Sequence, residues 1–366
     1  MDILENIPLA PFTTIGIGGP TRWFVEAASE EEIVEATDWA RVRGQPLFVL
    51  GGGSNLLVSD SGFDGLVLRV GLRGTEAVEA DPGSGRPDEL GKRVYKVYAG
   101  EDWDGFVERT AQDNCAGVEC LAGIPGTVGG TPVQNVGAYG QEVASAIERV
   151  RAFDLQDQAF VEFAASECGF AYRHSRFNSE DRNRFIVTRV DFRLTADGEP
   201  TLKYADLLRA VHESQSGGGQ PSLAEVAAIV RRVRESKGML LVEGDPDCRS
   251  AGSFFKNPVV TKEQLKRISA SSEKQPPRFP AGVGAENVGR VKVPAAWLIE
   301  QSGFAKGYTL GAAGISARHT LALINKGGAS ATEVLALASS IADAVEDRFG
   351  IRLAMEPVFV GFQRQE

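Results

Sequence analysis

The sequence has few of the residues that build metal centres and disulfide frameworks. It contains four cysteines and three histidines among 366 residues, and no two cysteines form a C-x-x-C pair. Because the histidines are also scattered, a structural zinc site is not expected, and we predict no metal site. Reduced thiols, as in a cytosolic protein, are the better interpretation of the cysteines.

The sequence also lacks an excess of positive charge and any long apolar run. Its 49 acidic and 39 basic residues give a formal net charge of −10, which argues against a general nucleic-acid-binding protein. A local basic pocket for an anionic small ligand remains compatible with this charge. The N-terminus has no basic segment before an apolar core, and no run approaches the roughly 18 apolar residues of a membrane span. We therefore expect no signal peptide, no membrane partner and a cytoplasmic location.

The residues that are present are typical of a globular protein with mixed helices and strands. Hydrophobic residues make up 43% and charged residues 24% of the chain, and the length predicts two or three domains. Capping boxes at Ser29, Ser222 and Ser330 each precede an apolar pattern of helical period. Helices are predicted over 29–44, 103–113, 222–238, 295–301 and 330–350. A strand with a glycine turn is predicted over 12–27, and further strands over 46–50, 56–58, 66–68, 94–99, 147–155, 185–194, 321–325 and 351–362.

Loop-like stretches and element order divide the chain. Residues 79–92 and 213–221 are rich in glycine, proline, serine or charge and predict exposed loops. A further domain boundary is expected just after the helix predicted over 222–238. We therefore predict an α+β protein with domains at 1–78, 79–238 and 239–366.

A glycine loop follows the predicted strand at 46–50. Three consecutive glycines, Gly51 to Gly53, precede Ser54 and Asn55. Glycines permit positive φ, and successive exposed N–H groups form a nest for anionic oxygens. The loop therefore suits a phosphate or pyrophosphate, although it is neither a Walker A loop nor a G-x-G-x-x-G loop. A glycine-rich hairpin turn explains the same residues about equally well.

A second glycine-rich region runs from 121 to 140. Its many glycines and alanines leave the backbone bare, so that a flat group, or one that bonds to the backbone, can lie against it. The alternative is a long flexible loop. The interleaved isoleucine, valine and proline residues favour packing, since long structureless loops are rare in compact domains.

Three further features carry side chains suited to catalysis. Arg173 and Arg176 lie among aromatic residues and suit an anion clamp, although a surface pair stacked on rings is the preferred interpretation from spacing alone. Ser253 precedes two phenylalanines, Lys256 and Asn257, and is either a nucleophile or proton donor or, as the simpler explanation, a turn hydroxyl. A carboxylate at Glu356 in an apolar strand pattern is costly unless it is paired or functional.

Taken in order, these features resemble a known family. The resemblance rests on Phe12-Thr13-Thr14, the glycine loop, the run from Ala122 to Gly130, Tyr172-Arg173-x-Ser175-x-Phe177, the run from Ala251 to Pro258, Ala296-Trp297-Leu298-Ile299-Glu300 and Glu356. The family is that of the UDP-N-acetylenolpyruvoylglucosamine reductases (MurB) of bacterial peptidoglycan synthesis. The resemblance covers almost the whole chain, and Gly-Ser-Phe-Phe-Lys-Asn-Pro together with Gly-Ile-Pro-Gly-x-Val-Gly-Gly is a specific combination.

The resemblance implies a fold and a cofactor. Residues 1–78 and 79–238 would be the two subdomains of an FAD-binding fold of the vanillyl-alcohol-oxidase type, and 239–366 would bind substrate. FAD would be held without a covalent bond, since neither glycine segment has a His or Cys. The implied cofactor-binding residues are Gly51, Gly52, Gly53, Ser54, Asn55 and Leu56 at the pyrophosphate, Gly123, Ile124, Pro125, Gly126, Gly129 and Gly130 along the cofactor, and Val187 near the flavin.

The resemblance also implies an activity. A monomeric enzyme would use NADPH and FAD to reduce UDP-N-acetylglucosamine enolpyruvate, a UDP-sugar enolpyruvyl ether, to UDP-N-acetylmuramate. Ser253 matches the family's proton donor, and Arg173 and Glu356 match its other two catalytic residues. Contacts to the substrate diphosphate would come from Tyr204, Lys237 and Asn257. The inserts at 79–92, 213–221 and 242–250 are long for the family.

Two other functions remain open. The chain would be an FAD-dependent oxidase or dehydrogenase of the same superfamily if it acted on another substrate. It would be a sugar-nucleotide or flavin sensor if it bound ligand without turnover. The combination of Arg173, Ser253 and Glu356 disfavours the sensor, because a binding protein needs no proton donor.

Overall fold

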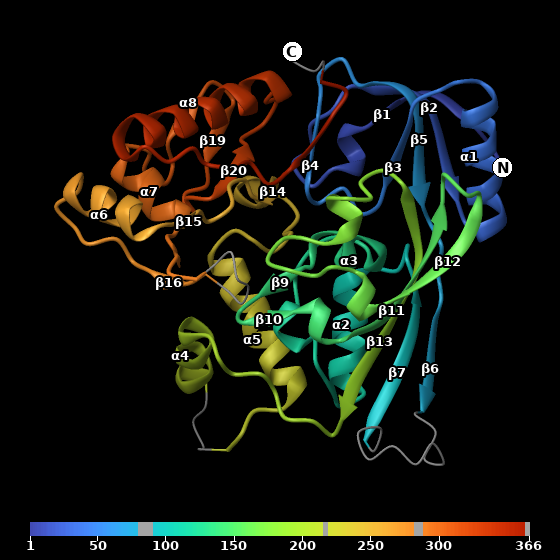
Figure 1. Cartoon of the computed structure of the whole chain (residues 1–366), viewed down its shortest axis with the longest axis horizontal. Helices are drawn as coiled ribbons and strands as arrows, with labels where there is room; N and C mark the ends of the chain where they lie inside the picture. Colours follow the sequence, from blue (N-terminus) through green and yellow to red (C-terminus); the bar gives the residue numbers. More distant parts are fainter. Residues whose placement is uncertain (80–90, 215–218, 282–287, 363–366) are drawn as a thin grey trace. The chain divides into compact units, whose positions relative to one another are not determined.

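The computed structural model describes residues 1–79, 91–214, 219–281 and 288–362, and these form two compact units (Figure 1). Residues 80–90 of the predicted loop at 79–92 and residues 215–218 of that at 213–221 lie outside the described residues. The first unit comprises Met1–Ile7, Thr21–Gly52 and Asp64–Glu235, whereas the second comprises Pro8–Pro20, Gly53–Phe63 and the chain from Ser236 onward. Two short N-terminal segments thus belong to the unit that contains the C-terminal third.

The first unit begins with a four-stranded sheet of order β1-β2-β5-β3 and one helix (Figure 1). Helix α1 starts after Ser29, whose side chain accepts a hydrogen bond from the Glu32 N–H, as the capping box predicts. Strands β3 and β5 are parallel. The bounds are β1 Leu4–Pro8, β2 Pro20–Ala27, α1 Glu30–Val42, β3 Leu47–Leu50 and β5 Phe63–Val70.

A second, antiparallel sheet has the order β12-β11-β13-β7-β6, and β8 also pairs with β13 (Figure 1). Seven of the twelve residues of the central β13 are buried and the others are half-buried, because the strand has neighbours on both edges and carries apolar residues on both faces. The bounds are β6 Thr75–Glu79, β7 Lys92–Tyr98, β8 Cys115–Ala116, β11 Ile147–Asp154, β12 Ala159–Ala164 and β13 Phe185–Ala196.

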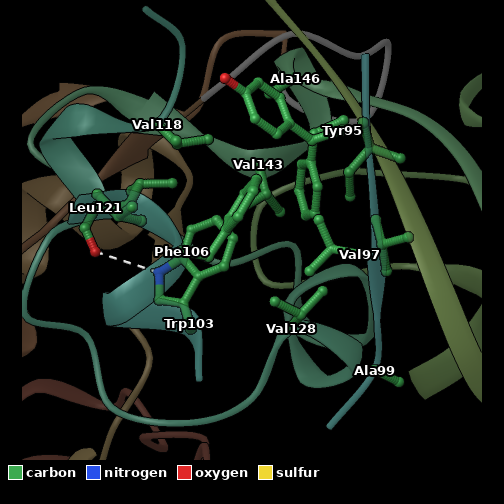
Figure 2. Packing of buried hydrophobic residues seen from close by; sticks show 14 of the residues in the cluster. Tyr95, Val97, Ala99, Trp103, Phe106, Val118, Leu121, Val128, Val143 and Ala146 are labelled. Atoms are coloured by element: carbon green, nitrogen blue, oxygen red, sulfur yellow. Dashed lines mark hydrogen bonds between the residues drawn. The ribbon is translucent and has the colours of Figure 1, made fainter. Parts of the chain in front are cut away.

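Helix α2, Trp103–Gln112, fixes the second glycine-rich region by packing its aromatic side chains under the sheet. Trp103 and Phe106 pack with Phe192 of β13, and the Phe106 and Phe192 ring centroids lie 5.0 Å apart. The buried Trp103 Nε1–H donates to the Leu121 carbonyl at 3.2 Å (Figure 2). One tryptophan therefore contributes apolar burial and also satisfies a backbone acceptor at the start of the glycine segment.

The glycine-rich region from 121 to 140 is packed, as its interleaved apolar residues predicted. Ala122 and Val128 are at most 1% exposed. Short helical turns and a small hairpin follow one another here, and two longer helices complete the unit. The bounds are η4 Glu119–Leu121, η5 Val128–Gly130, α3 Thr131–Gln134, β9 Gly137–Ala138, β10 Gln141–Glu142, η6 Val143–Ser145, η7 Ala165–Glu167, η8 Arg176–Asn178, α4 Ala205–Ser214 and α5 Leu223–Ser236.

The second unit packs small sheets against helix α8, Ala331–Phe349. This helix has the predicted reciprocal capping box of Ser330 and Glu333 and ends at Gly350 in the left-handed conformation. One sheet has the order β14-β20-β19-β18, another β15-β17-β16, and β4 pairs in parallel with β21. The bounds are β4 Leu56–Val58, β14 Ser250–Ser253, β15 Val259–Val260, α6 Lys262–Ala270, β16 Phe279–Pro280, β17 Val291–Lys292, α7 Ala295–Gln301, β18 Thr309–Leu310, β19 Ala313–Ile315, β20 Ala322–Asn325 and β21 Val358–Val360.

Two predicted strands are shorter than expected. The strand predicted over 12–27 begins only at Pro20, because residues 10–12 form a 3-10 turn and both Gly16 and Gly18 have positive φ. The strand predicted over 351–362 is limited to Val358–Val360. Its earlier residues instead make separate backbone hydrogen bonds to the chain around Phe254.

Candidate active site

The two predicted cofactor segments meet within the first unit. A Cβ atom added to Gly52 would overlap the Cα atom of Gly126 and lie 2.8 Å from the Thr127 nitrogen, and one on Gly51 would lie 3.0 Å from Thr127 Oγ1. Only glycine therefore permits this approach at Gly52. Bare backbone from two distant parts of the sequence is brought together, which is the arrangement that a backbone-bound cofactor requires.

The glycine segment that begins at Gly123 is fixed by hydrogen bonds to both the N–H and the carbonyl of Gly123. The Gly123 N–H donates to Asp104 Oδ1 at 2.6 Å, and the Gly123 carbonyl accepts from Arg234 Nε at 2.9 Å. Burial raises the pKa of Asp104, although the Gly123 N–H and Arg231 oppose this effect. Burial also lowers the pKa of Arg234. A buried arginine and a half-buried aspartate thus fix one glycine, which is a use of charge that sequence reasoning missed.

The far end of the same segment rests on strand β7 and the residues after it. The Val128 N–H donates to the Glu101 carbonyl and the Gly129 N–H to the Ala99 carbonyl, both at 2.9 Å. An added Cβ at Gly129 would lie 2.6 Å from the Ala99 Cβ, whereas one at Gly130 would meet nothing within 4 Å. Packing against Ala99 thus leaves no room for a side chain at position 129, whereas the space beside the backbone of Gly130 is open. The predicted flavin neighbour Val187 lies on β13 and is 7% exposed.

The rest of the first glycine loop belongs to the second unit. Gly53 has a φ of +64°, and an added Cβ would overlap the Phe12 carbonyl oxygen, so no other residue fits there. Asn55 Nδ2 donates to the Glu356 carbonyl at 3.3 Å, and the Val358 N–H donates to the Asn55 carbonyl at 2.9 Å. Two residues predicted from different motifs, Asn55 and Glu356, are therefore neighbours.

Arg173 lies in a tight turn of the first unit. Ala171 and His174 exchange both backbone hydrogen bonds at 3.0 Å, and Arg173 between them has a φ of +53°. A positive φ is uncommon for a long side chain and persists only when the surroundings enforce it. The guanidinium Nη2 donates to the Gly137 carbonyl at 3.0 Å. The backbone and the side chain of Arg173 are thus both held.

The neighbouring arginine serves another purpose. Arg176 Nε donates to Asp181 Oδ2 at 2.7 Å, and its guanidinium lies 4.2 Å from the centroid of the Phe163 ring. These contacts match the interpretation of a surface arginine stacked on aromatic rings rather than one arm of an anion clamp.

Tyr204, the predicted substrate residue, is 43% exposed and makes an edge contact with Tyr139, with the ring centroids 5.7 Å apart.

Ser253 and Glu356 lie in one strip of the second unit, which we define as residues 253–256 together with 354–356. The Glu356 N–H donates to the Phe254 carbonyl and the Lys256 N–H to the Ala354 carbonyl, both at 2.9 Å. On its other side the Phe254 N–H donates to the Leu321 carbonyl at 2.7 Å. A ladder of backbone bonds therefore sets the position of Ser253, which is half-buried at the end of β14.

The other two predicted substrate residues also lie in the second unit. The Asn257 Oδ1 accepts a hydrogen bond from the Ala295 N–H at 2.8 Å and so caps helix α7. Lys237 follows helix α5 and precedes Gly238, whose φ of +64° ends the helical path. Contacts of either residue with a substrate stay predictions.

Comparison with known families first defines the class of protein. Residues 21–159 match the family described as an FAD binding domain, and residues 245–360 match the C-terminal domain of UDP-N-acetylenolpyruvoylglucosamine reductase. These matches agree with the predicted α+β fold, in which an FAD-binding part precedes a C-terminal domain. The chain is therefore a flavoprotein.

Individual relatives then define the family. The chain is 44% identical to a UDP-N-acetylenolpyruvoylglucosamine reductase of Thermobifida fusca over 98% of both chains, and 44% identical to one of Streptomyces coelicolor over 98% of this chain and 90% of the relative. The solved structure of UDP-N-acetylenolpyruvylglucosamine reductase (MurB) from Thermus caldophilus is 27% identical, with a TM-score of 0.63 and 98% coverage of both chains. The chain belongs to the UDP-N-acetylenolpyruvoylglucosamine reductase family, which confirms the predicted resemblance.

The described part of the chain gives two further findings. None of its helices has both the length and the apolar character that crossing a membrane requires. In the same residues, no group of three or more His, Cys, Asp or Glu side chains could hold a metal ion.

Proposed function

We propose that this protein is an oxidoreductase that uses FAD and NADPH to reduce UDP-N-acetylglucosamine enolpyruvate to UDP-N-acetylmuramate in peptidoglycan synthesis. The observation that carries the proposal is the 44% identity to curated reductases over 98% of both chains. The residues expected from the family motifs, among them Arg173, Ser253 and Glu356, support it. The substrate is accordingly a small-molecule UDP-sugar.

The residues of the two glycine segments fit FAD. Gly52 packs directly on Gly126, which brings bare backbone of both segments together for an anionic pyrophosphate, and the open space beside Gly130 leaves room for a flat group. Bound FAD would transfer a hydride from NADPH to C3 of the enol ether, which is chemistry that no side chain of the protein can supply. The cofactor-binding set given above, from Gly51 to Val187, is part of this proposal.

Arg173 binds the carboxylate of the enolpyruvyl group. Its guanidinium offers two parallel N–H donors, a geometry that matches a carboxylate. Negative charge develops on C2 and the carboxylate during the reduction, and a donor already fixed by Gly137 stabilises that charge without having to reorient. The strained turn around Arg173 is the structural cost of this preorganisation.

Ser253 donates a proton to C2 of the substrate. A serine hydroxyl is an ordinary weak acid, but an enolate-type carbanion is a strong enough base for transfer from a positioned donor. Glu356 lies in the same strip and orients the group being protonated or acts as a second acid. Tyr204, Lys237 and Asn257 contact the diphosphate of the substrate. In the proposed domain division at 1–78, 79–238 and 239–366, the third domain binds the substrate.

An anaerobic titration tests the proposal. The purified protein should be yellow, lose its visible absorbance on addition of NADPH, and regain it on addition of the enolpyruvyl substrate, with formation of UDP-N-acetylmuramate by mass spectrometry. Oxygen consumption with small alcohols and no response to NADPH would instead indicate an oxidase of the same superfamily. Flavin binding with no turnover of any kind would indicate a sensor.

We also propose that the enzyme is a monomer located in the cytoplasm. Sedimentation equilibrium of the flavin-loaded protein tests the first part, and a mass of twice 39.1 kDa would refute it. Fractionation of cells that produce the protein tests the second.

A further inference from the structure

We propose that Asn135 is a positioning residue that holds Arg173 in its substrate-binding orientation. The proposal rests on the proposed function, because it takes Arg173 as the contact to the substrate carboxylate. Asn135 is 1% exposed, and its side chain bonds to Ala171, Glu142 and Ala144. Its role is to tie the turn that contains Arg173 to the hairpin that receives the Arg173 side chain.

The side chain of Asn135 makes three hydrogen bonds. Its Nδ2 donates to the Ala171 carbonyl at 2.9 Å and to Glu142 Oε2 at 3.0 Å, and its Oδ1 accepts from the Ala144 N–H at 3.2 Å. The partners fix the orientation of the amide, because a carbonyl accepts only from the nitrogen and an N–H donates only to the oxygen. Nearly all the bonding capacity of this buried amide is therefore used.

These bonds close a circuit around Arg173. Ala171 is one end of the turn and exchanges both backbone bonds with His174. Glu142 pairs with Gly137 in the hairpin, and the Gly137 carbonyl accepts from the Arg173 guanidinium. Asn135 thus bonds once to the turn and twice to the hairpin region. If the link were lost, the positive φ of Arg173 would be less strongly enforced, and the guanidinium would be free to move from its carboxylate-binding position.

The backbone of Asn135 gives a simpler role that the test must separate from this one. Asn135 ends α3 in the left-handed conformation with a φ of +42°, which asparagine tolerates better than most residues. Aspartate tolerates this conformation too and keeps the acceptor for the Ala144 N–H, but it removes the donor to Ala171. Asn135→Asp therefore preserves the backbone role and abolishes the positioning role.

Gln141 offers a matched control. It is another buried side-chain amide of the same hairpin, 5% exposed, and its Nε2 donates to Glu119 Oε1 at 3.1 Å while its Oε1 accepts from the Cys120 N–H. Gln141→Glu makes the same change as Asn135→Asp, since each replaces an amide by a carboxylate beside an existing glutamate. Gln141, however, makes no bond to the turn around Arg173.

The experiment measures binding by calorimetry to the oxidised, flavin-loaded protein, with UDP-N-acetylmuramate and UDP as probes. Only the first probe carries the carboxylate. Asn135→Asp is expected to weaken binding of UDP-N-acetylmuramate about tenfold to a hundredfold, the range for losing a hydrogen bond to a charged group, and to leave UDP binding and the visible spectrum of the flavin unchanged. Gln141→Glu is expected to leave the ratio of the two affinities unchanged. Arg173→Lys should lower the ratio, and adding Asn135→Asp to it should lower the ratio no further.

Each other outcome has a defined meaning. If Arg173→Lys lowers the ratio and Asn135→Asp does not, or if Gln141→Glu lowers it equally, the positioning role is overturned. If Arg173→Lys leaves the ratio unchanged, or the wild type binds neither probe, the proposed function itself fails. Should Asn135→Asp lose its flavin, Asn135→Gly makes the same test, since glycine keeps the left-handed backbone and lacks the donor.

Discussion

The turn around Arg173 and the strip around Ser253 each supply a proposed catalytic side chain, but they are built in different ways. In the strip, backbone bonds from Phe254, Lys256 and Glu356 set the position of the serine. In the turn, one pair of backbone bonds joins Ala171 and His174, and side chains such as those of Asn135 and Ser175 add further hydrogen bonds. A ladder of backbone bonds depends little on which residues flank it, whereas a side-chain scaffold depends on each of its members.

From this difference we expect one proposed catalytic group to tolerate changes in its neighbours and the other not to tolerate them. Ser253 should be sensitive to its own replacement and insensitive to loss of nearby hydroxyls. Arg173 should be sensitive to its own replacement and also to changes in buried side chains around it.

The largest effect is expected for Ser253→Ala. Removal of a positioned proton donor lowers a rate by about 10²–10⁴-fold, so turnover of the enolpyruvyl substrate should fall by that factor. Reduction of the bound FAD by NADPH should keep its wild-type rate, since it requires no proton from Ser253. Stopped-flow measurement of the two half-reactions separates these effects. Ser250→Ala, a change in the same strand, is the control, and an equal fall of both half-reactions in Ser253→Ala would exclude the proton-donor role.

A smaller effect is expected for Arg173→Lys. Lysine keeps the charge but loses the two parallel donors, so substrate turnover should fall about tenfold to a hundredfold, corresponding to one hydrogen bond to a charged group. Steady-state kinetics with varied substrate measures this. Arg176→Lys is the matched control, because Arg176 bonds to Asp181 and stacks on Phe163 and should affect turnover little. If both lysine variants behaved alike, a bidentate contact at Arg173 would be refuted.

Removal of one hydroxyl from each segment compares their construction directly. The fully buried Ser175 donates to the Val133 carbonyl at 2.7 Å and accepts from the Phe177 N–H. Ser175→Ala should therefore lower the free energy of unfolding by about 1–3 kcal/mol, because a buried carbonyl loses its donor. Ser250→Ala should cost only about 0.5–1 kcal/mol, since its hydroxyl accepts one long bond from Gly252.

Urea unfolding at a fixed excess of FAD measures both values. Substrate turnover at saturating NADPH is the second readout, and it should fall in Ser175→Ala and stay close to wild type in Ser250→Ala. Equal losses in the two variants would mean that the two segments do not differ in the way described.

Local sequence signals were sufficient to locate several helices and strands. The capping boxes at Ser29 and Ser330 predicted their helices to within a residue or two, because a cap acts through neighbours in the sequence. The glycine-rich region from 121 to 140 was correctly interpreted as packed. Gly52 illustrates how far such reasoning goes: the pattern indicates bare backbone but not that Gly126 is what lies against it.

Features that depend on distant segments could not be predicted in this way. Residues 8–20 and 53–63 group with the C-terminal third of the chain, and no local pattern encodes that grouping. The glycine turn predicted within 12–27 is present, since Gly16 and Gly18 have positive φ, but the strand itself begins only at Pro20. Asn135 was missed for a similar reason. An isolated asparagine after a short helix signals only a left-handed residue, and its bond to Ala171 spans 36 positions.

The smallest effect is expected in how the stability of the protein depends on acidic pH. It again contrasts a carboxylate held mainly by a side chain with one held mainly by backbone N–H groups. Hydrogen bonds from Arg184 lower the pKa of the buried Asp154 in the first unit. In the second unit burial raises the pKa of Asp60, but the N–H groups of Ala331 and Thr332 and the Thr332 hydroxyl outweigh it and lower the pKa overall. A carboxyl whose pKa is lowered on folding stabilises the protein above its unfolded pKa, about 3.9 for aspartate, and this contribution is lost as the pH falls through the folded pKa.

In wild type, the urea concentration at the unfolding midpoint should fall as the pH drops below about 4. Arg184→Gln should make this fall smaller, because the Arg184 side chain is the main cause of the lowered pKa of Asp154. Thr332→Val should leave that fall nearly unchanged, because the Ala331 and Thr332 backbone N–H groups still bond to Asp60 at 2.7 and 3.0 Å. The urea midpoint measured between about pH 2 and 7 distinguishes the two. A profile flattened equally by Thr332→Val would show that side chains, and not the helix backbone, stabilise the charge of Asp60.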